Sequence, residues 1–400
     1  MNSFAFWCRR NDKEEKTDDN PSVEAMVNIN LWIAGDQGKR KGKPIAFDFG
    51  LMLSPCDPEK SENNSSLRKL SKRLCNNFHN DISVLDHIKG ISLYCPFALE
   101  SNCFSDLMPC LNKETLGAIF NDRCRVVERD FTSRYMEVNL ANDENQKPFL
   151  LLSCDSIEIK RCGDGGASII NIDFPHRVRV AKDKPSRVYI RFRLLLGRNC
   201  GLVKRSDSHD KVFTSAFSRE ETIDLRINDY RTLNDEMRER IDGVAPDVYR
   251  LQGMTVHTLL MAQTNVTVES FEDLHEKRLL EENGVWEKYA PKGSAVSNVV
   301  AWHWKKKIDK PGEGYKTYLK LSYSVCNWKT IILYIVFLIF FSVMTNSLTT
   351  LLCDELCIGS INVTISSAII CIVLIVLCFG KPKIGNQLKR FFKSIHDGIL

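Results

Sequence analysis

The sequence predicts an α+β protein: a cytoplasmic, β-rich domain of antiparallel sandwich or barrel type with helices, followed by a C-terminal two-helix transmembrane hairpin. Three observations support this prediction. Apolar and polar residues alternate in many short segments of the 400-residue chain, as half-buried strands require. Two apolar segments without charged residues lie near the C-terminus. Lysines and arginines gather outside these segments, whereas the turn between them carries only acids.

The N-terminal region predicts a short polar lead and then the β-rich domain. Residues 1–24 are rich in charged and polar side chains and predict a flexible lead. The β-rich domain is expected over 25–230. Its first half should contain strands over 27–33, 45–53, 91–95 and 134–139 and helices over 67–78 and 113–121.

From 148 to 228 the sequence reads as mostly β, with short apolar runs separated by Gly, Pro and Asp. The clearest alternation predicts one strand with two chemically different faces. The apolar face carries Val188, Ile190, Phe192 and Leu194, and the polar face carries Arg187, Tyr189, Arg191 and Arg193. Strands at this spacing favour an antiparallel sandwich or barrel.

The C-terminal third is expected to be helical. A helical stalk is predicted over 231–304, in part because Ser270 and Asp273 have the spacing of a capping box. A basic juxtamembrane segment follows over 305–329, then the two-span hairpin over 330–380. A basic amphipathic tail helix is predicted over 381–400, with the interfacial residues Leu388, Lys389, Arg390, Phe391, Phe392 and Ile395.

The distribution of cations predicts the orientation of the hairpin. Lysines precede the first apolar segment and basic residues follow the second, while Asp354 and Glu355 occupy the turn. The positive-inside rule then places both termini in the cytoplasm, with the hairpin in the inner (plasma) membrane. Two very apolar core helices are the alternative interpretation of the same segments. The net charge of +5 is read first as attraction to anionic lipid headgroups.

The cysteines indicate a reduced compartment. Fifteen cysteines are present, but the N-terminus resembles no signal peptide and no paired metal-binding spacing occurs. Most cysteines are expected to be small buried hydrophobic residues. Cys353 and Cys357 flank the predicted turn across the membrane, and the sequence leaves open whether they form a disulfide.

No catalytic residues, metal ligands or cofactor sites are predicted, because the chain contains no Walker loop, HExxH or GxSxG motif. A cysteine nucleophile stays open, although no feature singles one out. The glycine-rich stretch at 163–166 lies between two expected strands, so a turn is favoured there over a phosphate-binding loop.

Two groups of polar residues are the candidate functional positions. The face formed by Arg187, Tyr189, Arg191 and Arg193 could bind a nucleotide or single-stranded nucleic acid, or could be an ordinary solvated face. Inside the first predicted span, Ser342, Asn346 and Thr349 share one helical face. These residues predict either packing within the hairpin or the wet side of a path between associated hairpins.

In this arrangement, and without a shared motif, the last 70 or so residues resemble the two-transmembrane effectors of bacterial antiphage systems, of the kind associated with retrons or cyclic-nucleotide signalling. The resemblance implies an antiviral effector whose cytoplasmic domain senses a partner or ligand and whose hairpins cluster to permeabilise the membrane. Expected partners are the lipid bilayer, a regulatory protein or nucleoprotein, and further copies of the chain. The alternative functions are a membrane-tethered binding or scaffold module and a tethered hydrolase or nuclease.

Overall fold

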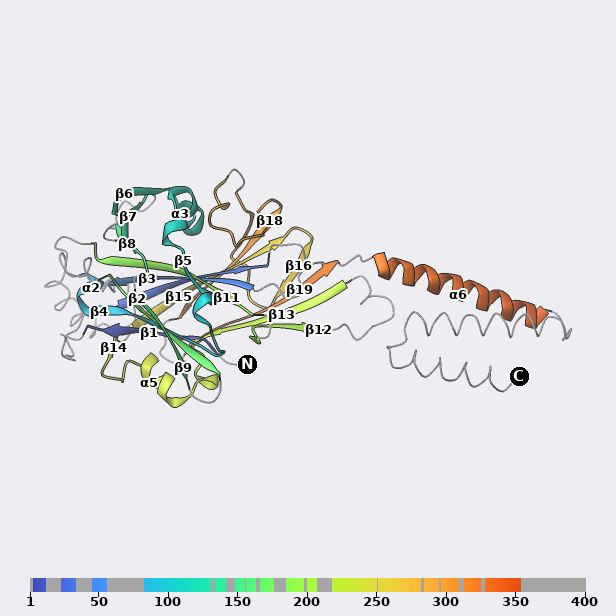
Figure 1. Ribbon diagram of the computed structural model, residues 1–400, viewed down its shortest axis with the longest axis horizontal. Helices are drawn as coiled ribbons and strands as arrows, with labels where there is room; N and C mark the ends of the chain where they lie inside the picture. Colours follow the sequence, from blue (N-terminus) through green and yellow to red (C-terminus); the bar gives the residue numbers. More distant parts are fainter. Residues whose placement is uncertain are drawn as a thin grey trace. The chain divides into compact units, whose positions relative to one another are not determined.

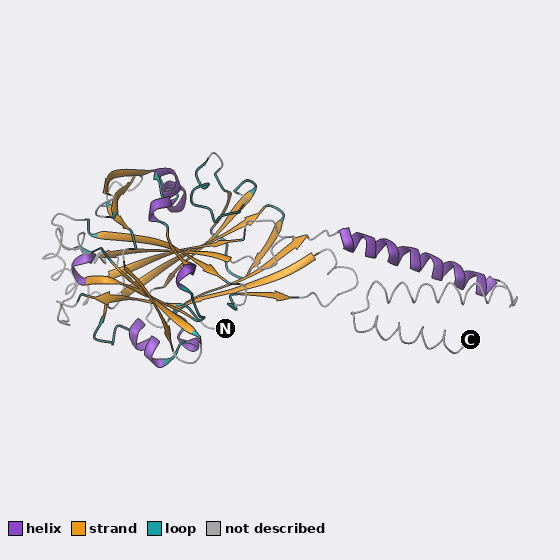
Figure 2. Cartoon of the chain, viewed as in Figure 1, coloured by secondary structure: helices purple, strands orange, loops and turns teal. Residues whose placement is uncertain are grey.

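The computed structural model of the protein describes the chain in segments. These are residues 3–11, 23–33, 45–55, 83–130, 134–141, 148–154, 156–162, 166–175, 185–197, 200–206, 218–249, 251–281, 284–294, 296–308, 313–324 and 328–353. The chain divides into two compact units. The first, Met1–Asp207 with Glu220–Tyr323, is built mainly of β-strands (Figures 1 and 2). The second comprises Ser208–Arg219 and Ser324–Leu400, and its main described element is helix α6 (Trp328–Cys353).

A ten-stranded sheet forms the centre of the first unit. Most neighbouring strands are antiparallel, but β15 runs parallel to β2 and β11 runs parallel to β8. The strands, in sheet order, are β17 (Glu276–Leu279), β18 (Val299–Ile308), β15 (Leu251–Gln263), β2 (Val23–Trp32), β3 (Ile45–Pro55), β11 (Arg187–Leu196), β8 (Phe149–Leu152), β7 (Tyr135–Leu140) and β6 (Cys124–Asp130), with β5 (Phe104–Asp106) also paired to β11.

Two smaller sheets complete the strand content. The five-stranded sheet has the order β14 (Val248–Tyr249), β1 (Ala5–Arg10), β4 (Ile88–Cys95), β10 (Ala167–Asp173) and β9 (Ser156–Cys162). The four-stranded sheet has the order β12 (Val203–Ser206), β13 (Ser218–Ile227), β19 (Tyr315–Ser324) and β16 (Val266–Ser270).

The five-stranded sheet packs on one face of the ten-stranded sheet through phenylalanine rings. Phe4, just before β1, stacks on Phe47 of β3 with ring centroids 5.1 Å apart, and Phe6 meets Phe49 edge-on at 6.1 Å. Phe49 in turn stacks on Phe192 of β11. This sheet-on-sheet contact forms a sandwich core, because alternate residues of each strand point to the same side.

The opposite face of the ten-stranded sheet is covered by short helices and a turn segment. Helix α3 (Lys113–Phe120) begins at Asn112, whose Oδ1 accepts a hydrogen bond from the Thr115 amide at 2.7 Å, and ends at Asn121 in the left-handed conformation. Helix η4 (Met108–Cys110) belongs to the same core cluster as α3, whereas α5 (Asp235–Ile241) packs against Trp7 of β1. The remaining short helices are α2 (Val84–His87), η3 (Ser101–Cys103) and η5 (Tyr230–Thr232). The turn segment 284–294 places Trp286 and Tyr289, each 1% exposed, in the same core cluster as residues of α3.

Several predicted elements are present. Helix α3 and strand β7 lie within about one residue of the predicted 113–121 and 134–139, and β2, β3 and β4 lie where alternation placed strands. The glycine-rich stretch connects β9 and β10, which pair as antiparallel neighbours from Cys162 and Ala167. The helix predicted over 67–78 lies outside the described residues.

The predicted α+β class is wrong, because the described chain is mostly β-sheet with a few short helices in the first unit. The structure differs most over 231–304, where a helical stalk was expected. The described residues of this range include strands β15 to β18, and α5 is their one α-helix. Ser270 ends a strand instead of capping a helix. The basic segment after residue 305 belongs to β18 and β19, and the predicted lead contains the buried strand β1.

The predicted transmembrane hairpin is also wrong on the present findings. None of the described helices combines the length and apolarity that a bilayer crossing needs. The first predicted span is helical and lies within α6. The predicted membrane permeabilisation and the predicted inner-membrane localisation depended on this hairpin and are therefore wrong as well. The second predicted span and the tail helix lie outside the described residues.

Candidate functional site

The candidate site lies on the face of the ten-stranded sheet opposite the phenylalanines. Strand pairing brings polar residues of five strands into two adjacent rows. One row joins Arg191, Gly50, Asn28, His257 and Lys305 as successive Cα partners. The next row joins Arg193, Asp48, Asn30, Leu259 and His303. We call seven of these residues the polar band: Asn28, Asn30, Asp48, Arg191, Arg193, His257 and His303.

Asp48 is the central acceptor of the polar band. Its side chain is fully buried and accepts hydrogen bonds from Arg193 Nε at 2.5 Å and Arg193 Nη2 at 2.9 Å. Trp32 Nε1 at 2.8 Å and the Tyr289 hydroxyl at 2.7 Å also donate to Asp48. One carboxylate therefore binds four donor groups, which links strands β2, β3 and β11 to the turn segment 284–294.

Arg191 lies beside this group without a carboxylate of its own. Arg191 is 0% exposed. Its Nε donates to the Tyr289 hydroxyl at 2.5 Å, and its Nη1 donates to the Tyr189 hydroxyl at 2.6 Å. Among the described residues, no carboxylate forms an ion pair with Arg191. The inner part of the polar band thus holds two buried guanidinium groups and one carboxylate, which leaves an excess positive charge out of water.

The protonation states of this group are held by its neighbours. Burial opposes the charge of Arg191, but the adjacent Tyr189, Tyr289 and Asp48 outweigh burial, so the pKa of Arg191 is raised. Burial likewise opposes the charge of Arg193, and the hydrogen bond and charge of Asp48 raise its pKa. Burial raises the pKa of the Tyr289 phenol well above its ordinary value. Both arginines are therefore cations, and Tyr289 is a neutral donor.

Gly50 makes room for the arginine and tyrosine side chains. A Cβ at this position would lie 2.8 Å from Arg191 Nη1 and closer still to the Tyr189 hydroxyl. We expect Gly50→Ala to lower the free energy of unfolding by about 1–3 kcal/mol, because fully buried rings and guanidinium groups have little room to move. Gly197→Ala is the matched control, since a Cβ there meets nothing within 4 Å. Equal denaturation midpoints for the two variants would contradict this account.

Four buried polar atoms of the polar band have no hydrogen-bond partner in the described structure. They are Asn28 Nδ2, Asn30 Oδ1, Arg191 Nη2 and His257 Nε2. Native proteins pair most buried polar groups, so four unpaired atoms on neighbouring strands are a marked departure. Each such atom costs about 1–3 kcal/mol if nothing binds it. Other such atoms occur elsewhere among the described residues, but these four share one face, where Asn28 and Asn30 lie between the arginines and the histidines.

The histidine end of the polar band is less buried. His257 Nδ1 and His303 Nε2 lie 3.0 Å apart, so one neutral ring donates to the other. His275 packs edge-on against His303, and Glu276 Oε2 lies 4.0 Å from His303 Nδ1. Burial, together with the charge of Lys305 and the adjacent histidines, lowers the pKa of His257 to about 4. Burial and the same surroundings lower the pKa of His303 to about 4.

The arginine face predicted from sequence is partly the inner end of the polar band. Tyr189, Arg191 and Arg193 share one side of β11, as the alternation indicated, but that side is buried instead of solvated. A surface open to a nucleic acid strand is therefore not what these three residues form. The sequence interpretation missed Asp48, Asn28, Asn30 and the histidine pair. Asn28 and Asn30 at alternate positions of β2, and Asp48 between two phenylalanines of β3, were a visible signal.

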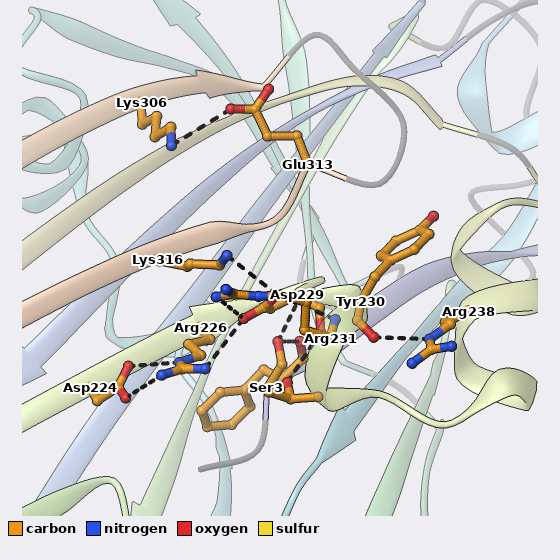
Figure 3. A network of polar contacts seen from close by, with 12 residues as sticks. Ser3, Asp224, Arg226, Asp229, Tyr230, Arg231, Arg238, Lys306, Glu313 and Lys316 are labelled. Carbon is orange, nitrogen blue, oxygen red and sulfur yellow. Dashed lines mark hydrogen bonds and ion pairs between the residues drawn. The ribbon is translucent and has the colours of Figure 1, made fainter.

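A second polar network ties the N-terminus to η5 (Figure 3). Asp229 is 3% exposed, its amide donates to Ser3 Oγ at 3.0 Å, and its carboxylate lies 3.4 Å from Lys316 Nζ and from the guanidinium of Arg226. Burial alone would raise the pKa of Asp229, but the Arg231 hydrogen bond and the charges of Lys316 and Arg231 lower it. Because the charges in this network are paired, we infer that it stabilises the fold by connecting the start of the chain to η5.

A surface cleft of about 330 Å³ lies at the end of α3. Arg278 of β17 crosses it and donates to the Ala118 carbonyl at 2.5 Å, to Asn121 Oδ1 at 3.3 Å and to Glu281 Oε1 at 2.8 Å. Arg278, the principal cation of the cleft, thus connects α3 to β17 through these hydrogen bonds. We regard the cleft as a weaker candidate than the polar band.

The described cysteines and acidic residues do not form a metal centre. Within the described segments, no group of three or more His, Cys, Asp or Glu side chains could hold a metal ion. Cys8, Cys95 and Cys154 are buried free thiols, and burial raises the pKa of Cys8 to about 12. The expectation that most cysteines are buried does not hold among the described residues, because Cys103, Cys110, Cys124, Cys162 and Cys200 are only partly buried. Cys357 lies outside the described residues, so its pairing with Cys353 stays open.

Of the polar residues predicted inside the first span, Ser342 and Asn346 lie on α6 and are exposed. The helix also contains Thr349, whose side chain is not among those described. The six predicted interfacial residues at 388–395 lie outside the described part of the chain.

Comparisons with known proteins give no family for this chain. No family model matches it, and no curated protein matches it. Among solved structures, it is similar to two M1 zinc metallopeptidase structures from Deinococcus radiodurans, at 8% and 7% identity, over 75% of this chain and 42% of those chains, with TM-scores of 0.24 and 0.23. It is also similar to yeast LTA4 hydrolase, at 8% identity over 78% of this chain and 31% of that one, with a TM-score of 0.26. The chain spans less than half the length of these proteins, and similarity at this level carries no conclusion about activity.

Proposed function

We propose that this chain is a ligand-binding module, and that its ligand is a small anion held by the polar band. The observation that carries the proposal is Arg191, a fully buried guanidinium with an unused Nη2 and no carboxylate partner among the described residues. A buried charge is normally paired, because removing it from water costs several kcal/mol. A bound carboxylate or phosphate would supply the missing partner.

The neighbouring unpaired atoms favour the same class of ligand. Asn28 Nδ2 can donate to an anion, and Asn28 is separated from Arg191 in its row by Gly50, over which the Tyr189 hydroxyl and the Arg191 guanidinium lie. Asn30 Oδ1 can accept from a hydroxyl of the ligand or from a bridging water. The ligand is a small molecule, since burial of the arginines leaves no surface for an extended strand. Binding, and not catalysis, is proposed.

Substitution of Asn28 by Leu distinguishes a ligand-binding role of the polar band from a purely structural role. If the unpaired amide is kept for a ligand, Asn28→Leu should raise the unfolding free energy by about 1 kcal/mol, because an unsatisfied buried group is removed. The same variant should bind anions at least about tenfold more weakly. Asn171→Leu is the matched control: its amide bonds Ser92 and Glu158, so it should lose stability and keep anion binding.

Binding is measured by calorimetry and thermal shift at constant ionic strength, with inorganic phosphate, malonate and adenosine monophosphate as probes. The expected result is saturable binding of at least one probe with a matching rise in Tm. Absence of saturable binding by all three probes would overturn the proposed function. The predicted regulatory protein or nucleoprotein partner and the predicted self-association stay predictions.

A further inference from the structure

A second, separate cavity lies between the start of the chain and helix α5. It measures about 60 Å³, and its walls include residues of β1, β14, η5 and the start of β15. Four aromatic rings and two carboxylates give it its chemical character: Phe6, Trp7, Tyr230, Tyr249, Asp242 and Glu313. Figure 3 shows Tyr230 and Glu313, which belong to η5 and to the chain just before β19.

The walls of this cavity have a one-sided charge. Among the described residues that line it, two are acidic and none is Lys, Arg or His. The carboxylate of Asp242 accepts a hydrogen bond from the Tyr230 hydroxyl, which fixes both side chains. Within the described segments, Glu313 forms an ion pair with Lys306 at 3.8 Å, and both side chains are about half exposed, so this ion pair contributes little. The cavity therefore presents negative charge that no cation in its walls offsets.

Two of the four aromatic rings already lie beside a cation that is not among the residues lining the cavity. Arg240 lies over Trp7 with 5.5 Å from the guanidinium carbon to the ring centroid, and Arg10 lies over Tyr249 at 5.7 Å. Aromatic faces attract cations through the ring quadrupole, and groups of such rings are suited to methylated ammonium ions. Rings and carboxylates together favour a cation that carries apolar substituents.

The size of the cavity limits the ligand. One water occupies about 10–15 Å³ on this measure, so 60 Å³ corresponds to roughly four to six non-hydrogen atoms. A trimethylammonium or tetramethylammonium group has that size. We propose that this cavity binds a methylated ammonium group, with the aromatic rings around its methyl groups and Asp242 and Glu313 as counter-charges.

This site is independent of the polar band, since the two share no residue and would take ligands of opposite charge. The probes are tetramethylammonium and choline, and the control ligand is the neutral isostere of choline in which carbon replaces nitrogen. Calorimetry of the full chain should show saturable binding of the two cations and at least about tenfold weaker binding of the isostere. Equal affinity for choline and its isostere, or no saturable binding of either cation, would overturn the proposal.

Two variants test the residues of the cavity. Glu313→Gln should weaken choline binding about three- to tenfold, because it removes one counter-charge from a partly exposed position. Glu269→Gln is the control, an exposed carboxylate of β16 that pairs with Lys320 and does not line the cavity. An unchanged choline Kd in Glu313→Gln, in a variant with unaltered Tm, would contradict the assigned role. Loss of binding in both variants would equally contradict it.

Discussion

Asp48→Asn is expected to lower the free energy of unfolding by about 3–5 kcal/mol, the largest effect among the variants considered. The substitution keeps the shape of the side chain but removes the charge that faces Arg193, and it points an amide group at donors. A buried cation that loses its partner costs this amount, because the guanidinium stays out of water without compensation. Chemical denaturation should show a lower midpoint with an unchanged m value.

Asp224→Asn makes the same chemical change at a more exposed ion pair and serves as the matched control. Asp224 pairs with Arg226 at 2.8 Å, with side chains that are 17% and 24% exposed, and we expect a loss of about 1 kcal/mol or less. A second test combines Asp48→Asn with Arg193→Met, which removes the stranded charge. The double variant should recover part of the lost stability. If Asp48→Asn lowers the free energy of unfolding by less than about 1 kcal/mol, Asp48 is not the stabilising counter-charge of Arg193.

The strands around Asp48 could be predicted from sequence because their two faces differ in chemistry. Phe47, Phe49 and Leu51 alternate with Asp48 and Gly50, and this period of two identifies the strand whichever strands pair with it. The partner strands could not be predicted, because β2 pairs with β15 more than two hundred residues away. The polar band forms because the strands pair in this register. The sequence therefore shows its residues one by one but does not indicate that they lie together.

The burial of Arg191 and Arg193 was beyond the sequence argument for a related reason. Alternating cations on a strand normally mark a wet face, since lone buried arginines are rare. Here the turn segment 284–294 covers that side, and Tyr289 accepts hydrogen bonds from both arginines, through its hydroxyl from Arg191 and through its carbonyl from Arg193. Nothing local to 187–193 indicates that a tyrosine about a hundred residues later will close over it.

The error over 231–304 has a local cause. The stretch Asp235–Ile241 is helical, with Asn234 accepting from the Met237 amide at 2.9 Å. This helix led to the prediction that the whole region is helical. Ser270 has the spacing of a capping box with Asp273, but it lies at the end of a strand, and its Oγ donates a hydrogen bond to the Glu272 carboxylate instead. A side-chain motif of two residues does not outweigh strand pairing by β15, β16 and β18.

The histidine pair predicts a loss of stability in acid. His257 and His303 stay neutral in the folded protein until their pKa values near 4, whereas in the unfolded chain each takes up a proton near its ordinary value of 6.5. The unfolded state thus binds more protons between these values, so the stabilising contribution is complete above pH 6.5 and declines as the pH falls toward 4. After allowance for partial exposure, we expect about 2–4 kcal/mol for the pair.

The measurement is the unfolding free energy as a function of pH, compared between the native chain and the double variant His257→Gln with His303→Gln. The slope between pH 6.5 and 4 should be clearly shallower in the double variant, whatever its absolute stability, because the neutral amides bind no protons. Thr267→Val, at an exposed position of β16, should keep the native slope. Protonation of both rings would set like charges 3.0 Å apart, beside Lys305 and within reach of only one carboxylate, Glu276. If the native and double-variant slopes coincide, these rings are not held neutral, and the histidine end of the polar band is open to water.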